Sequence, residues 1–184
     1  MNTTKVTTGK VRLSYLNVVT ARAMDEGETP KFSSAILIPK KINGKVNPDL
    51  AKIEAAVEEA KQQGKSKKYG GSIPAKLKLP LRDGDEEHPD DEAYAGHFFL
   101  NASNARKPIL LDTDKRPLEK DGDLYSGAYA RVAISFYPFA GKSKGVAVSL
   151  ESILKLEDGE SLGGGIVTYD DAVKAFDDEE DDLL

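Results

Sequence analysis

The sequence contains no cysteine and only two histidines, His88 and His97. The absence of thiols excludes disulfides, thiolate zinc sites and a cysteine nucleophile. Two imidazoles are too few for a multi-histidine metal site. No stretch approaches 18 apolar residues, and the N-terminal segment lacks the apolar core of a signal peptide. We therefore expect a soluble protein that acts in the cytoplasm.

Sequence signatures of common enzymes are also missing. The glycine run 163–165 is not followed by the lysine of a phosphate-binding loop. No serine elbow accompanies either histidine. The acidic segment 83–92 offers carboxylates for a divalent cation, as a metal-dependent hydrolase would need. Glycine and proline in this segment leave the carboxylates without a fixed spacing, so a solvated acidic loop is the favoured interpretation.

Charge is segregated along the chain, whose net charge is −5. Residues 1–82 hold sixteen basic and seven acidic residues, a net charge of +9, whereas residues 83–123 hold five and twelve, a net charge of −7. Residues 170–184 hold eight acidic residues and one lysine, a net charge of −7. A basic half beside an acidic tail indicates a polyanionic ligand and a built-in competitor for it. A solvated surface with an acidic solubility tail is the alternative.

Alternating apolar residues predict a mainly β chain with one clear helix. The helix is expected to begin at Pro48, with Asn47 as its N-cap, and to end at Gly64. Strands are expected at 10–19, 32–38, 97–103, 108–112, 127–139 and 144–156, with a weaker extended segment at 73–81 and a short helix at 169–176. This order predicts an all-β barrel or sandwich in residues 1–165, followed by a tail in 166–184.

The segment 127–139 separates two kinds of side chain on its two faces. The face expected to point into the core carries Ala128, Ala130, Val132, Ile134 and Phe136. The opposite face carries Tyr129, Arg131, Tyr137 and Phe139. Aromatic rings stack on nucleic-acid bases with about 1–3 kcal/mol per base, and arginine contacts phosphates. The pattern favours a nucleic-acid-binding face, although packing under a neighbouring element would also explain these rings.

Basic residues beside aromatic ones extend this candidate interface. Lys142 and Lys144 lie in the hairpin that follows the strand. Further candidates for DNA binding are Lys67, Lys68 and Tyr69, then Lys76 and Lys78, and finally Arg106 and Lys107. Cations at such positions are able to contact a phosphate backbone.

The C-terminal end is a run of carboxylates followed by two leucines. Its residues are Asp177, Asp178, Glu179, Glu180, Asp181, Asp182, Leu183 and Leu184. Such a block repels itself and buries too little apolar surface to fold, so we expect a disordered tail. A tethered polyanion competes with nucleic acid at high effective concentration and, once displaced, is free to dock on partners. A tail that only aids solubility is the alternative.

Three segments resemble one known family. They are HFFLNASNARKPILLD (97–112), YSGAYARVAISFYPF (125–139) and GKSKGVAVSLESILKLEDGESLGGG (141–165), and together with the acidic end they are similar to bacteriophage single-stranded DNA-binding proteins. The resemblance implies an OB-fold-like antiparallel barrel and sequence-independent binding of single-stranded DNA, with no cofactor and no enzymatic activity. It also implies work in phage DNA replication, recombination and repair in the cytoplasm of the bacterial host, with the tail contacting replication proteins such as a polymerase or helicase.

Two features depart from the family pattern. Tails of the family commonly end in an aromatic residue, whereas this chain ends in Leu183 and Leu184. The helix expected from Pro48 also falls early for an OB fold, whose helix usually lies between the third and fourth strands. A competing hypothesis is an acidic interaction protein, or DNA mimic, that binds other DNA-binding proteins instead of DNA.

Overall fold

The structure is a computed structural model that describes residues 3–23, 25–162 and 173. The expected tail (166–184), the short helix expected at 169–176 and the domain end expected at residue 165 lie outside the described residues, apart from Val173.

Strands dominate the described part of the chain, as expected. The strands are β1 (Lys5–Thr7), β2 (Val11–Arg22), β3 (Lys31–Pro39), β4 (Lys41–Ile42), β5 (Lys45–Val46), β6 (Arg82–Asp83), β7 (His97–Asn104), β8 (Ile109–Leu111), β9 (Tyr129–Ala140) and β10 (Lys144–Glu157). The helices are α1 (Pro48–Lys67), the single turn α2 (Gly84–Glu87) and the 3-10 turn η1 (Asp121–Asp123). The six strongest strand predictions are confirmed, whereas the weaker segment 73–81 forms only one bridge, between Lys78 and Gly145.

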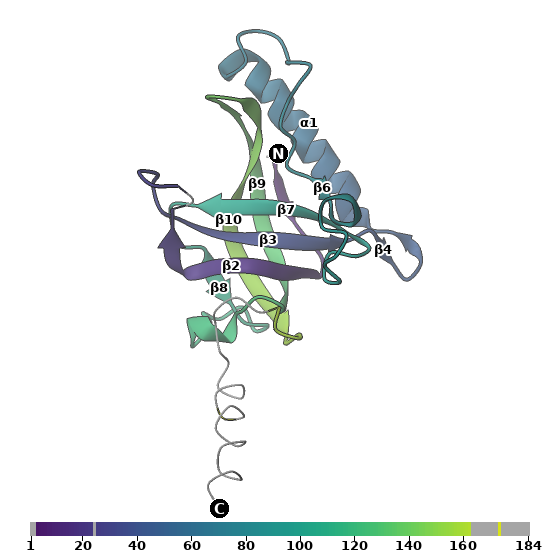
Figure 1. Cartoon of the computed structure of the whole chain (residues 1–184), viewed down its shortest axis with the longest axis vertical. Coiled ribbons are helices and arrows are strands. Elements are labelled where there is room, and N and C mark those ends of the chain that lie inside the picture. Colours follow the sequence, from purple (N-terminus) through teal and green to yellow (C-terminus); the bar gives the residue numbers. More distant parts are fainter. Residues whose placement is uncertain (1–2, 24, 163–172, 174–184) are drawn as a thin grey trace, which may run out of the picture.

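Five strands close into a barrel in the order β2–β3–β7–β10–β9, because β9 pairs with β10 on one side and with β2 on the other (Figure 1). β1 continues the line of β2 along β9, and β8 continues the line of β7 along β10. The pairings are antiparallel except that β10 runs parallel to β7 and β8. This is a five-stranded Greek-key barrel of the OB type, which confirms the expected fold.

The barrel interior takes one face of each strand. The five residues expected in the core, Ala128 just before β9 and Ala130, Val132, Ile134 and Phe136 within it, are at most 2% exposed. Ile36 and Ile38 of β3 and Leu100 of β7 are fully buried in the same core. Burial of this interior face leaves the opposite face of each strand to form the outer surface. Functional side chains on these strands are therefore found on the outside of the barrel.

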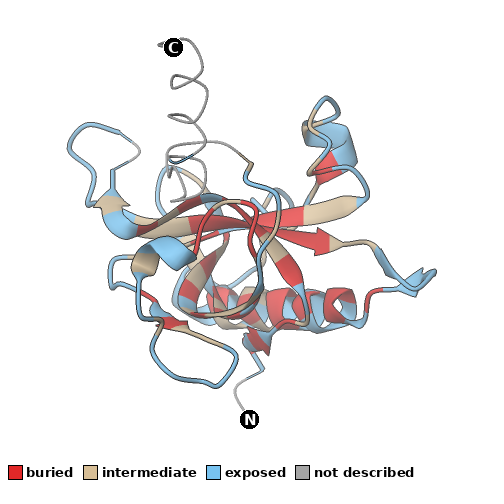
Figure 2. Cartoon of the chain, turned by 90° about the horizontal axis from the view of Figure 1, so that it is seen from below, coloured by how far each residue is buried: buried red, intermediate tan, exposed pale blue. Residues whose placement is uncertain are grey.

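In the sequence, helix α1 lies between β3 and β7, the second and third strands of the barrel. In space it packs against β9 and β10, with its buried residues turned toward the strands (Figures 1 and 2). Its start is as predicted: the Asn47 side chain accepts a hydrogen bond from the Asp49 amide at 3.0 Å. Asp49 in turn accepts from the amide of Gly9, which fixes the helix start to the junction of β1 and β2. The apolar stripe of Leu50, Ile53, Val57 and Ala60 is buried, as expected.

The predicted end of the helix is wrong, because α1 continues through Gly64 to Lys67. Gly64 is buried at a close approach between the helix, the Tyr69 ring and Pro138 of β9. A Cβ atom at this position would lie 2.3 Å from the ring and 2.8 Å from the Pro138 Cβ. The glycine therefore provides space inside the helix instead of terminating it.

Replacing Gly64 by alanine should destabilise the protein. Alanine gains about 1 kcal/mol of helix propensity, but overpacking of this kind costs about 1–3 kcal/mol, and both contacts are under 3.0 Å. We expect a net loss of free energy of unfolding in urea titrations. Gly122→Ala is the control, since no atom lies within 4 Å of its added Cβ; equal stability of the two variants would contradict this packing.

Candidate nucleic-acid interface

A cleft of about 920 Å³ opens on the outer face of β2, β3 and β7. Its floor consists of small side chains that are neighbours across the strands: Asn17 pairs with Ser33, Ser33 with Ser103, and Ala35 with Asn101. Short polar side chains leave room for a ligand above the sheet and supply hydrogen-bond donors and acceptors. The floor of the cleft is thus formed by short, mostly polar side chains of β2 and β3, which follow one another in the sequence, and of β7, which is distant from them.

Tyr15 stands at the side of this cleft with 66% of its surface exposed. Its φ of 46° lies in the left-handed region, and the pairing of β2 with β3 shifts register between Ser14 and Asn17. The irregularity makes Ser14 and Tyr15 face outward in succession, and the Leu16 amide donates to the Ser126 hydroxyl instead of to a strand. Strain of this kind, held by its surroundings, is typical of functional positions.

Cations stand at the mouth of the cleft. Arg22 and Lys31 are register partners at the ends of β2 and β3, and both are exposed. The loop between them also contributes Glu28 to the lining. An exposed ring, a polar floor and flanking cations are the components that bind single-stranded nucleic acid.

The other half of the same outer face is covered by residues 84–96, here called the strap. Tyr94 of the strap packs on Leu37 and Phe99. Its hydroxyl lies 3.4 Å from the Ser14 hydroxyl, one residue before Tyr15. The strap therefore covers the apolar part of the β3–β7 surface and bounds the open, polar part.

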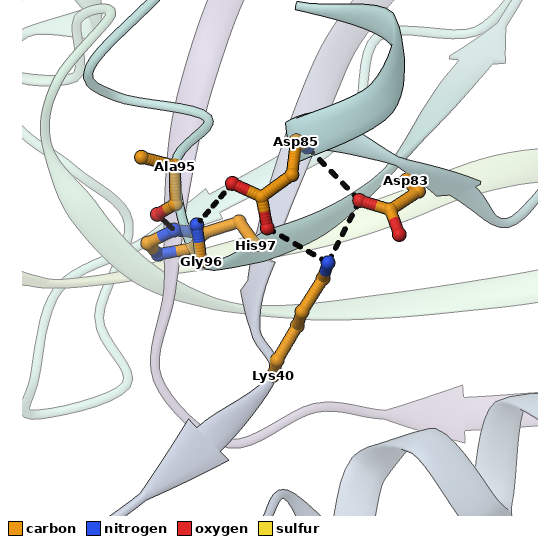
Figure 3. A network of polar contacts seen from close by, with 6 residues as sticks. All are labelled: Lys40, Asp83, Asp85, Ala95, Gly96 and His97. Carbon is orange, nitrogen blue, oxygen red and sulfur yellow. Dashed lines mark hydrogen bonds and ion pairs between the residues drawn. The ribbon is translucent and has the colours of Figure 1, made fainter. Parts of the chain in front are cut away.

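An ion-pair clamp holds the strap to the barrel (Figure 3). The Lys40 ammonium donates at 2.8 Å to both Asp83 and Asp85, and the second oxygen of Asp85 accepts from the Gly96 amide at 3.0 Å. Hydrogen bonds from Lys40 lower the pKa of both carboxyls below their ordinary value. Both ends of the strap are thus tied to one lysine at the end of β3.

The clamp predicts acid-sensitive stability. Because the folded-state pKa values of Asp83 and Asp85 are depressed, their contribution is present above the unfolded-state pKa near 3.8 and is lost as the pH falls through and below it. Lys40→Met should remove this contribution, so the urea midpoints of wild type and variant should differ at pH 6 and converge toward pH 3. Lys41→Met is the control, and a difference between wild type and Lys40→Met that stays constant with pH would contradict the clamp.

Residues predicted on the outer face of β9 do face outward, but in different surroundings. Tyr129 is half-buried with Lys10 and Arg12 over its ring at 4.6 and 5.3 Å, and the Arg131 side chain donates to the Thr8 carbonyl at 2.9 Å. Phe139 is half-buried against Gly145, whereas Tyr137 is 40% exposed. Tyr137 is therefore the most accessible of the three rings for stacking.

The lysines predicted in three separate segments come together around the β9–β10 hairpin. Lys142 and Lys144 lie at its tip, Lys67 and Lys68 at the end of α1, and Lys76 and Lys78 on the extended segment that bridges to Gly145. The prediction that Tyr69 binds DNA is wrong, because its ring is only 4% exposed and its hydroxyl donates to the Gly145 carbonyl at 2.5 Å. It links the helix end to the hairpin and has no face open for a base.

The predicted pair Arg106 and Lys107 lies in the turn after β7. Arg106 is exposed, three residues beyond Ser103 of the cleft floor. Lys107 forms an ion pair with Asp121, so its charge is balanced within the protein. Of the two, Arg106 is the one free to act beside the cleft.

The cleft itself was not predicted. Its ring, Tyr15, and its cations, Arg22 and Lys31, lie in or beside strands that the sequence does indicate. One signal was present: apolar residues alternate from Val11 to Leu13, and the alternation then slips by one residue before Leu16. Such a slip is typical of a β-bulge, which re-aims a side chain.

The acidic segment 83–92 shows no arrangement for a metal. In residues 3–23, 25–162 and 173, no group of three or more histidine, aspartate or glutamate side chains is placed to hold a metal ion. Asp83 and Asp85 pair with Lys40, and Glu87 pairs with Arg82. Among the same residues, no helix is long and apolar enough to cross a membrane.

Solved structures share this architecture. The single-stranded DNA-binding protein from bacteriophage Enc34 in complex with ssDNA aligns with a TM-score of 0.75 at 24% identity, covering 87% of this chain and 90% of that one. Gp2.5, a single-stranded DNA-binding protein encoded by bacteriophage T7, aligns with a TM-score of 0.61 at 14% identity, covering 92% and 93%. At these identities the likeness establishes the fold, that of the phage OB-type single-stranded DNA-binding proteins.

The sequence comparisons establish the family. The family model described as "Enterobacter phage Enc34, ssDNA-binding protein" matches residues 4–184, so the chain belongs to this family. A putative protein p50 of Acyrthosiphon pisum secondary endosymbiont phage 1 is 31% identical over 186 residues, covering 98% of both chains. The family and the solved neighbours are ssDNA-binding proteins and not enzymes, which confirms the expectation of a non-enzymatic protein.

Proposed function

We propose that this protein binds single-stranded DNA along the cleft of β2, β3 and β7, without sequence preference. The observation that carries the proposal is the exposed Tyr15 ring beside a polar floor, with Arg22 and Lys31 at the mouth. A base stacks on a ring whatever its identity, and cations contact the phosphates. Membership of the phage ssDNA-binding family supports this assignment.

In this proposal the bound DNA strand continues from the cleft toward Tyr137. Ser103 of the floor pairs with Ser149 of β10, and Ser149 pairs with Ser135 of β9. Tyr137 follows Ser135 on the same face, two residues along the strand. The small residues of this row leave the surface low between the two exposed rings, so that Tyr137 supplies a second stacking position.

In the cell, the protein protects and organises single strands during phage DNA replication, recombination and repair, in the cytoplasm of the bacterial host. The acidic residues 177–182 compete with DNA for the cations and, once displaced, recruit replication proteins through their charge and the two terminal leucines. The family assignment and the segregation of charge along the chain support these roles.

Two substitutions of Tyr15 test the cleft. Tyr15→Ala and Tyr15→Asn both remove the ring, so each should weaken poly-dT binding by about 1–3 kcal/mol, or about five- to 150-fold in Kd. Asparagine tolerates the left-handed backbone at this position, so Tyr15→Asn should be more stable than Tyr15→Ala by about 0.5–1 kcal/mol.

Fluorescence titration and urea unfolding of both variants check these two effects. Val19→Ala is the control, because Val19 is half-exposed on the same strand but is not part of the cleft lining. Unchanged poly-dT affinity in both Tyr15 variants would remove the cleft from the binding site.

Removing the tail after Gly165 should tighten binding several-fold, because the tethered carboxylates no longer compete for the cations. The gain should shrink as salt is added. The control keeps the length of the tail and changes the six carboxylates of 177–182 to their amides, which should reproduce the gain. Equal affinity of full-length and truncated chains would show that the tail does not compete, and no affinity in either would favour the acidic interaction protein.

A further inference from the structure

Seven lysines surround the tip of the β9–β10 hairpin, and we call this surface the tip patch. Its members are Lys65, Lys67, Lys68, Lys76, Lys78, Lys142 and Lys144. All seven are exposed. They come from three separate parts of the chain, so their proximity is a product of the fold.

Three contacts assemble the patch. Gly64 lets the last turn of α1 approach Pro138 of β9, and the Tyr69 hydroxyl then donates to the Gly145 carbonyl. Lys78 pairs through its backbone with the β10 side of the hairpin: its amide donates to the Lys144 carbonyl, and its carbonyl accepts from the Val146 amide. The helix end, the extended segment and the hairpin are thus held against one another.

The patch has no internal counter-charge. The sequence has no aspartate or glutamate between Glu59 and Asp83, nor between Asp123 and Glu151. Within residues 3–23 and 25–162, no hydrogen bond or ion pair engages any of the seven ammonium groups. Other lysines of the fold do pair, as Lys10 does with Glu157 and Lys155 with Asp158. Uncompensated like charges repel one another, and a polyanion relieves that repulsion.

The aromatic rings within the patch are packed and not available for stacking. Tyr69 is buried, and Phe139 is half-buried against Gly145. A ligand here meets ammonium groups without a ring beneath it. Lysine binds phosphate as a point charge, so the patch recognises backbone charge and not bases.

The patch lies within reach of the cleft but is separate from it. Ser149, which pairs with Ser103 of the cleft floor, is five residues from Lys144 along β10. At about 3.3 Å per residue, this separation is about 17 Å. One DNA strand is therefore long enough to occupy both surfaces.

We propose that the tip patch is a second DNA site that binds the phosphate backbone without reading bases, while the cleft holds the bases. This inference rests on the proposed function of the cleft. Long strands would use both surfaces, and strands that fill only the cleft would use one. The phosphate contacts at the patch would then supply much of the salt dependence of binding.

The test compares a tip variant with a charge-matched control in the full-length chain. The tip variant carries Lys76→Gln, Lys78→Gln, Lys142→Gln and Lys144→Gln. The control carries the same change at Lys41, Lys45, Lys115 and Lys120, which are exposed and lie outside the patch. Circular dichroism and urea unfolding establish that both fold.

Two measurements read out the patch. For long poly-dT, the slope of log affinity against log salt should fall by about 0.7 for each phosphate contact removed, in the tip variant and not in the control. An abasic oligonucleotide, which has phosphates but no bases, should bind wild type and Tyr15→Ala alike and lose affinity for the tip variant.

Equal salt slopes and equal abasic binding in tip variant and control would overturn the proposal. So would a tip variant that binds DNA as wild type does and only loses its response to tail removal, since the patch would then serve the acidic tail. Failure of the cleft has a different signature: Tyr15→Ala would bind poly-dT like wild type, while the tip variant would still lose affinity.

Discussion

Closure of the barrel through β9 is the constraint on which the rest of the structure depends. This strand is hydrogen-bonded to β10 along one edge and to β1 and β2 along the other. With both edges paired, its side chains have only two directions available, into the barrel or outward. Ala130, Val132 and Ile134 fill the interior, so every polar or aromatic group that serves a ligand must stand on the outer surface. The polar cleft and the tip patch are both outer-surface features for this reason.

The sequence was sufficient to predict what depends on local periodicity. Alternation in β9, the Asn47 cap and the apolar stripe of α1 each report a local pattern, and each prediction is confirmed. Predictions that required knowledge of the neighbours failed. Tyr69 looked like an exposed ring beside lysines, but it is buried because Gly64 admits it against the helix. The cleft could not be predicted because its floor forms only when β2, β3 and β7 lie side by side.

The acidic segment 83–92 takes on a structural meaning once its neighbours are known. Its carboxylates Asp83 and Asp85 hold the strap to Lys40, and Tyr94 covers the apolar surface of Leu37 and Phe99. Without this cover, the outer face of β3 and β7 would present an apolar patch next to the polar cleft. Negative charge at the edge of a DNA site also repels phosphates. The strap therefore completes the fold and, in the proposed function, limits the surface that a DNA strand is able to occupy.

Stacking and charge enter the proposed function as separate contributions, and this separation explains how a tethered competitor is displaced. A run of carboxylates offers charge but no rings, so in the proposed function residues 177–182 compete with DNA only for cations such as those of the tip patch. Bases on Tyr15 and Tyr137 add stacking energy that the carboxylates do not match. Salt weakens the charge-dependent part of both interactions, but it leaves stacking largely intact. A DNA strand long enough to cover both surfaces therefore displaces the tail through its bases.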